Sequence, residues 1–143
     1  MNFEAVDKNG KEIIFSEKDL IGKKTVLYFY PKDNTSGCTT EACDFRDNMN
    51  RLLAHAQIIG VSPDSISSHQ KFRQKQGLNF TLVADTNHEL AIKYGVWKEK
   101  SMYGRKYMGI ERSTFILNEK GEIIKEWRKV KVPGHVDEIL ISL

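Results

Sequence analysis

The stretch that decides the fold runs from Thr25 to Cys43 and has the sequence TVLYFYPKDNTSGCTTEAC. Its first six residues, 25–30, are nearly all β-formers, which predicts a central strand buried on both faces. A polar loop follows over 31–37. From about Cys38 to His55 the apolar residues recur at helical spacing, which predicts a helix with one apolar stripe. The stripe consists of Ala42, Phe45, Met49, Leu52 and Leu53.

The rest of the chain extends this unit into an α/β fold. A hairpin is expected around Asn9-Gly10, and a capping box over 16–19 predicts a short helical turn that stops near Gly22. The remaining order of elements predicts a mixed sheet flanked by helices, a thioredoxin-like arrangement with extra elements. A polar loop is expected around 98–107. We expect strands over 3–6, 12–15, 58–62, 80–84, 113–117 and 122–127, and helices over 65–76, 88–94 and 135–143.

Length and composition fit an ordinary globular protein with a single domain over residues 1–143. No apolar run approaches the roughly 20 residues needed to span a bilayer. The first residues lack the pattern of a secretory signal, so a cytoplasmic protein without membrane contact is expected. The 22 basic and 19 acidic residues are interleaved, with a net charge of +3. Nucleic-acid binding is therefore not expected, although a modestly basic surface suits an acidic protein partner.

Two cysteines are too few for a disulfide framework or a four-cysteine zinc site. They are either small buried hydrophobes or redox groups. The chain has no His-x-x-x-His and no Cys-x-x-Cys pair, so neither a metal nor a cofactor is predicted. The spacing of the histidines singles out none as a catalytic base. They are His55, His69, His88 and His135.

Cys38 is expected in the first turn of a helix, at the carboxyl end of a central strand where open α/β sheets bind ligands. The free backbone N–H groups and the positive end of the helix dipole favour a thiolate there. A thiolate is the species that attacks a peroxide oxygen. Thr35, three residues earlier, is placed to turn its hydroxyl toward the same pocket. The spacing alone is equally compatible with a buried cysteine that happens to follow a turn.

The complete pattern of Pro31, Thr35 and Cys38 resembles the Pro-x-x-x-Thr-x-x-Cys active-site signature of the peroxiredoxins. The five-residue separation of Cys38 and Cys43 is similar to that of the bacterioferritin comigratory protein, or peroxiredoxin Q, subfamily. The resemblance extends from about Phe3 to Leu143. Further matching blocks are Phe29-Tyr30-Pro31-Lys32, Glu41-Ala42-Cys43, Phe45-Arg46-Asp47, Val96-Trp97, Tyr103-Gly104, Gly109-Ile110 and Arg112-Ser113-Thr114-Phe115.

The chain departs from the subfamily pattern in two places. Ser36 stands where proline is common, which loosens the loop but removes no catalytic atom. The usual Ala-Pro near the start is represented by Ala5-Val6, and the segment ahead of Phe3 is shorter.

The resemblance implies a thioredoxin-like peroxiredoxin fold and a thiol peroxidase that reduces hydrogen peroxide and organic hydroperoxides. Cys38 would be the peroxidatic nucleophile, Thr35 would hydrogen-bond the peroxide, and Pro31 would shield the pocket from water. Arg112 would stabilise the thiolate and the charge on the leaving oxygen. Glu41 would orient Arg112. Without the resemblance, Arg112 is an ordinary solvated residue at a strand end and Glu41 a carboxylate complementing a helix dipole.

Cys43 is the only other thiol that could condense with a Cys38 sulfenic acid. In an intact helix residues five apart have Cα atoms about 8.6 Å apart and point about 140° away from each other, whereas a disulfide requires about 7 Å or less. We therefore expect the first turns of the helix to unwind when the disulfide forms. The strained disulfide would be reduced by a thioredoxin-like partner. Alternatively, Cys43 is structural and an external thiol resolves the sulfenic acid.

Other functions remain open at this point. A thioredoxin-type disulfide oxidoreductase lacks its usual Cys-x-x-Cys marker here, and a cysteine protease lacks an identifiable base. A peroxide sensor or holdase would use the same oxidation of Cys38. The resemblance implies a monomer or a weak dimer.

Overall fold

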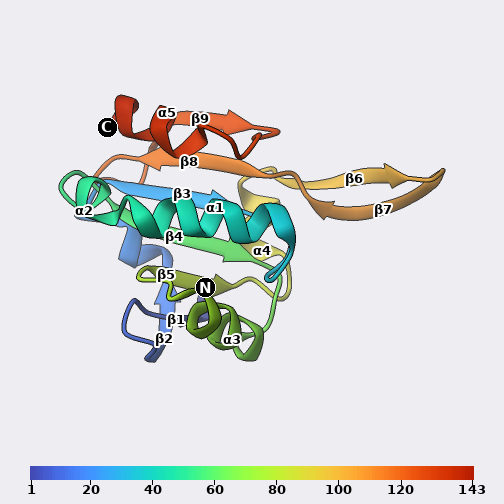
Figure 1. Ribbon diagram of the computed structural model, residues 1–143, viewed down its shortest axis with the longest axis horizontal. Helices are drawn as coiled ribbons and strands as arrows, with labels where there is room; N and C mark the ends of the chain where they lie inside the picture. Colours follow the sequence, from blue (N-terminus) through green and yellow to red (C-terminus); the bar gives the residue numbers. More distant parts are fainter.

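The computed structural model describes residues 1–143 and consists of one large mixed sheet, helices on both of its faces, and a separate two-stranded hairpin (Figure 1). The strands are β1 Asn2–Val6, β2 Glu12–Ser16, β3 Thr25–Phe29, β4 Gln57–Ser62, β5 Thr81–Ala84, β6 Trp97–Met102, β7 Arg105–Ile110, β8 Ser113–Leu117 and β9 Ile123–Arg128. The helices are η1 Glu17–Leu20, α1 Ser36–Asp47, α2 Met49–Leu52, α3 Ile66–Gln76, α4 Glu89–Lys93 and α5 His135–Ser142.

Strand β3 lies inside the seven-stranded sheet, whose order is β2-β1-β5-β4-β3-β8-β9. It pairs in parallel with β4 and antiparallel with β8. Every residue of β3 is buried, because helices cover the sheet on both sides. The predicted central strand is therefore confirmed, as are the thioredoxin-like fold class, the hairpin of β1 with β2 and the hairpin of β8 with β9.

Two hydrophobic clusters fill the two faces of the sheet. One packs the sheet against α1, α2, α3 and α5 and includes Phe45, Phe72 and Ile139. The other packs the opposite face against α4 and η1, through Leu90 and Leu20. The alternation of side chains along the strands produces this division, since successive residues point to opposite faces.

The helix predicted from Cys38 to His55 is wrong at its bounds and in its continuity. Helix α1 begins at Ser36, two residues earlier, and the helical path is interrupted at Asn48. There the side-chain amide of Asn48 donates to the carbonyl of Asp44 at 2.7 Å, in place of the backbone N–H of a continuous helix. Four of the five predicted stripe residues are buried, but Leu53 is exposed, because Leu52 occupies the core position and its neighbour points away.

The predicted polar loop around 98–107 is also wrong, because these residues lie in the hairpin of β6 and β7. Tyr103 and Gly104 both have positive φ angles, 51° and 77°, which suit a tight two-residue hairpin turn. Residues 101–108 are all exposed, so neither strand carries the apolar alternation of a half-buried strand. The hairpin projects away from the body of the molecule, at the end toward which β3 and β4 run (Figure 1).

Within the described chain, none of the helices combines the length and the apolar character that crossing a membrane would require.

Candidate active site

Cys38 lies in the first turn of α1 and is 2% exposed. Its sulfur accepts a hydrogen bond from Nη2 of Arg112 at 3.2 Å. Arg112 occupies the short connection between β7 and β8, and its carbonyl accepts from the backbone N–H of Val130 at 2.9 Å. The fold thus brings together two side chains that are 74 positions apart in the sequence.

The other arm of the same guanidinium holds a carboxylate. Nη1 of Arg112 donates to Oε1 of Glu41 at 2.5 Å, and the Glu41 side chain is 1% exposed. Burial raises the pKa of Glu41 to about 7, although the charge and the hydrogen bond of Arg112 act in the opposite direction. Arg112 therefore bridges the carboxylate and the sulfur with one positive charge. The structure thus brings together Cys38, Arg112 and Glu41, three of the predicted site residues.

Two polar atoms behind this bridge are buried without a hydrogen-bond partner, Oε2 of Glu41 and Oη of Tyr28. Burial raises the pKa of Tyr28 well above its usual value, and the negative charges of Glu41 and Cys38 raise it further. The Tyr28 phenol is therefore neutral. Its ring stacks on Phe45 at a centroid distance of 4.4 Å and belongs to the same buried cluster as Cys38.

Thr35 and Pro31 lie in the loop that precedes α1. Thr35 is the N-cap residue, and its carbonyl accepts from the backbone N–H of Thr39 at 2.8 Å. Its hydroxyl donates to the carbonyl of Lys32 at 2.8 Å, not to Cys38. With the hydroxyl proton used in this way, Oγ1 has only lone pairs to offer a ligand. Pro31 is half-buried and lies two residues after the end of β3.

Cys43 faces a different direction from Cys38. Its sulfur lies 3.6 Å from Oε1 of Gln76, at the end of α3, and the residue is half-buried. Both cysteines are free thiols, and α1 is continuous through both of them. The structure does not bring the two sulfurs together. The reduced helix and a Cys38–Cys43 disulfide are accordingly two different backbone conformations.

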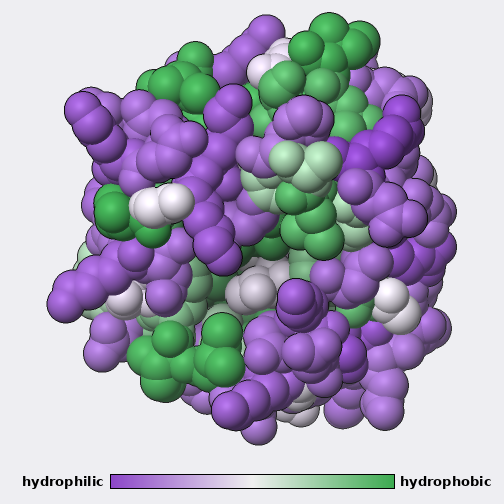
Figure 2. Space-filling model, turned by 90° about the vertical axis from the view of Figure 1, so that its left-hand side faces the viewer, coloured by the Kyte–Doolittle hydropathy of each residue, from purple (hydrophilic) through white to green (hydrophobic).

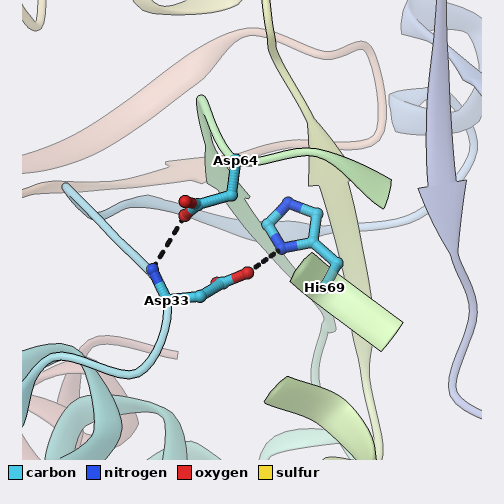
Figure 3. A group of neighbouring side chains, drawn as sticks. All are labelled: Asp33, Asp64 and His69. Carbon is cyan, nitrogen blue, oxygen red and sulfur yellow. Dashed lines mark hydrogen bonds and ion pairs between the residues drawn. The ribbon is translucent and has the colours of Figure 1, made fainter. Parts of the chain in front are cut away.

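The sequence did not indicate the cluster of side chains around Asp33 that holds the loop between β3 and α1 in place (Figure 3). The Asp33 carboxylate accepts from the Tyr30 hydroxyl at 2.6 Å, the Ser68 hydroxyl at 2.8 Å and pairs with Nδ1 of His69 at 2.7 Å. The Asp33 backbone N–H donates to the Asp64 carboxylate at 2.8 Å. The partners on α3 are 35 and 36 positions away, so no local pattern could have revealed them.

Asp33, Asp64 and His69 are close enough to one another to be considered as metal ligands. Their hydrogen bonds instead connect the loop that follows β3 to α3 and to the end of β4. Nε2 of His69 lies 3.0 Å from the carbonyl of Val83 and must donate to it, while Nδ1 faces the Asp33 carboxylate. Both ring nitrogens are engaged, and the cluster serves as an anchor for the loop that carries Pro31 and Thr35.

Residues 1–126 match the model of the AhpC/TSA family. The chain belongs to this peroxiredoxin family. It is 57% identical over 126 residues to peroxiredoxin Bcp of Bacillus subtilis, a match that covers 87% of the chain and 80% of the relative. It is 51% identical over 127 residues to peroxiredoxin Bcp of Xanthomonas campestris, with 85% and 77% covered.

Solved structures of peroxiredoxin Q are similar over nearly the whole chain. One from Xanthomonas campestris is 44% identical with a TM-score of 0.88 and covers 97% of this chain and 88% of its own. One from Xylella fastidiosa is 39% identical with a TM-score of 0.90, with 99% and 86% covered. These similarities confirm the resemblance seen in the sequence, and this peroxiredoxin is a thiol peroxidase.

Replacing Arg112 with glutamine should slow the oxidation of Cys38. The variant keeps an amide donor but loses the positive charge beside the sulfur, and we expect the second-order rate with hydrogen peroxide at pH 7 to fall about 10²–10³-fold. Stopped-flow measurement of the single-turnover reaction gives this rate. Arg105→Gln, at the exposed first residue of β7, is the matched control and should react like the wild type. A wild-type rate in Arg112→Gln would contradict this electrostatic role.

The raised pKa of Glu41 predicts how the stability of the peroxiredoxin depends on pH. A carboxyl whose folded pKa lies above its unfolded value of 4.5 binds its proton more tightly in the folded state, so its contribution is present below pH 4.5 and lost as the pH rises through about 7. The Glu41→Gln variant has no titrating group at this position and therefore does not lose this stability as the pH rises. Denaturant titrations should show the variant gaining stability relative to the wild type between pH 5 and pH 8; an unchanged difference would contradict the prediction.

Removing the loop anchor should destabilise the fold and impair the site. Asp33→Ala removes the partner of the buried Tyr30 and His69 side chains and of the half-buried Ser68 hydroxyl, and we expect a loss of about 3–5 kcal/mol in the free energy of unfolding. Asp33→Asn keeps an oxygen acceptor for the Tyr30 hydroxyl and places an amide group within hydrogen-bond reach of Nδ1 of His69, so it should lose much less. Equilibrium unfolding in urea compares the two. Equal stability of both variants would show that the hydrogen bonds of Asp33 do not fasten the loop.

Proposed function

We propose that this peroxiredoxin reduces hydrogen peroxide and organic hydroperoxides through a Cys38 sulfenic acid that Cys43 resolves and a thioredoxin-type protein re-reduces. The observation that carries the proposal is the contact of 3.2 Å between Nη2 of Arg112 and the Cys38 sulfur, with Nη1 held by Glu41. A fixed positive charge beside a sulfur at a helix N-terminus favours the thiolate. A structure of the bacterioferritin comigratory protein of Xanthomonas campestris, 43% identical, is described in terms of alkyl peroxide reduction.

In the first step the Cys38 thiolate attacks one oxygen of the hydroperoxide, and the oxygen–oxygen bond breaks. The sulfur becomes a sulfenic acid, and the second oxygen leaves as an alkoxide or hydroxide that takes up a proton. Arg112 stabilises the negative charge that moves from the sulfur to the leaving oxygen. The free lone pairs of the Thr35 hydroxyl accept the proton-bearing end of the peroxide, and Pro31 excludes water.

In the second step the Cys43 sulfur attacks the sulfenic sulfur, a disulfide forms, and the oxygen leaves as water. This step requires the first turns of α1 to unwind, which breaks the bond from the Thr39 N–H to the Thr35 carbonyl and that from the Thr40 hydroxyl to the Ser36 carbonyl. It also moves Cys43 away from Gln76. The dithiol of the reductant then exchanges with this disulfide. The reductant is oxidised to a disulfide, and Cys38 and Cys43 return to thiols.

We also propose that residues 1–143 act as one domain, as a monomer or a weak dimer. The two hydrophobic clusters lie on opposite faces of the same sheet, which supports a single folding unit.

Oxidation with one equivalent of peroxide tests the two cysteine roles. The wild type should form one intramolecular disulfide, Cys43→Ser should stop at a sulfenic acid on Cys38, and Cys38→Ser should not react. Mass spectrometry with a sulfenic-acid trap distinguishes the three products. Steady-state turnover with thioredoxin, thioredoxin reductase and NADPH should be lost in Cys38→Ser. A wild-type product with a free Cys43 thiol beside a persistent Cys38 sulfenic acid would overturn the resolving role and indicate an external thiol.

A further inference from the structure

The hairpin of β6 and β7, residues 97–110, is called the arm below. It pairs only within itself and takes no part in the seven-stranded sheet. Its base lies at the active site, because Arg112 follows the last residue of β7 by two positions. Lys100 on β6 is in the same electrostatic environment: partial burial lowers its pKa, the charge of Arg112 lowers it further, and that of Cys38 opposes the change. The arm therefore extends outward from the end of the sheet toward which β3 and β4 run (Figure 1).

The arm carries the whole excess charge of the chain. Its sequence, WKEKSMYGRKYMGI, has four basic residues and one acidic residue. The chain as a whole has 22 basic and 19 acidic residues, so the other residues contribute 18 of each and are neutral in sum. The basic residues of the arm are Lys98, Lys100, Arg105 and Lys106.

The arm also exposes large apolar side chains that the fold does not use. Tyr103 at the turn is 99% exposed, and Met102 beside it is 56% exposed. Tyr107 and Met108 on β7 are 44% and 48% exposed. On the side of the molecule opposite the arm, hydrophilic side chains predominate and the apolar ones form separate groups (Figure 2). Exposed aromatic residues and methionines next to basic residues are typical of a protein-binding surface.

We propose that the arm is the docking surface for the protein that re-reduces this peroxiredoxin, and that the partner presents acidic side chains around an apolar patch. The proposal rests on the proposed function, since it assumes a Cys38–Cys43 disulfide that a protein dithiol must reach. The reductant has to approach the face on which the arm stands, and the positive charge steers an acidic protein to that face. A second copy of the chain is disfavoured, because a symmetric contact would bring two arms of the same charge together.

Charge reversal at the tip of the arm tests this proposal. The test variant is Arg105→Glu with Lys106→Glu, which leaves Lys100 and the base of the arm unchanged. The control variant is Lys71→Glu with Lys120→Glu, which changes the net charge equally at exposed positions on α3 and in the turn between β8 and β9. A third variant, Met102→Ser with Tyr103→Ser, removes apolar surface without changing the charge.

Three rates separate docking from chemistry. We expect kcat/KM for thioredoxin, measured through NADPH oxidation, to fall at least tenfold in the tip variant and to remain within twofold of the wild type in the control. The wild-type value should decrease with added salt, and this dependence should be weaker in the tip variant. The serine variant should lower kcat/KM while keeping the salt dependence. Single-turnover oxidation by peroxide and reduction of the disulfide by dithiothreitol should be unchanged in all variants.

The outcomes distinguish the proposal from the function on which it rests. If wild-type Cys38 does not react with peroxide, the proposed function fails. If it reacts normally but the tip variant keeps a wild-type kcat/KM for thioredoxin, only the docking proposal fails. A change in the peroxide rate of the tip variant would make the arm part of the peroxide pocket instead. A concentration-dependent dimer in sedimentation that the tip variant abolishes would make the arm a contact between copies, and it too would overturn the proposal.

Discussion

The site depends on one guanidinium that is shared between two acceptors in a nearly dry environment. Arg112 donates to the Cys38 sulfur and to the Glu41 carboxylate from different nitrogens. A single positive charge cannot fully compensate two buried negative charges, and the burial of Glu41 favours its neutral form, with a pKa raised to about 7. When Glu41 is protonated, the positive charge of Arg112 interacts mainly with the sulfur of Cys38. The carboxyl group thus holds the guanidinium in position without competing fully for its charge.

The order of the strands in the sheet places Arg112 next to Cys38. Strand β8 lies beside β3 and runs antiparallel to it, with Ser113 opposite Phe29. This register puts the residue before β8, Arg112, next to the end of β3, where the chain turns into the loop and then α1. The loop is fastened from the other side by Asp33, which reaches α3 through Ser68 and His69. Cys38 is therefore held between two attachments that come from distant parts of the sequence.

The parts of the structure that local sequence determines were predictable, and those that depend on distant partners were not. The apolar run over 25–30 and the change to helical spacing after it established the strand, the loop and the helix. Asp33 gave no signal, because its role arises only when α3 packs beside the loop. The arm was missed because its strands cover no core and so lack alternation. Arg112 was found through resemblance alone, since a single arginine at a strand end carries no local pattern.

In the proposed cycle, the Arg112 charge that favours the thiolate also restrains the opening of α1. In the first turns of α1, Cys38 and Glu41 are the buried residues before Ala42, and most of their neighbours are exposed or half-buried. Segments with few buried contacts open at low free energy. In the proposed cycle, oxidation converts an anionic sulfur into a neutral sulfenic acid, so Arg112 loses its ionic attraction to Cys38 and keeps its hydrogen bond to Glu41. The reaction that makes unwinding necessary therefore also removes the main electrostatic restraint on it. In this cycle, the anchored Asp33 on one side and the buried Phe45 on the other would be the fixed points between which the chain unwinds.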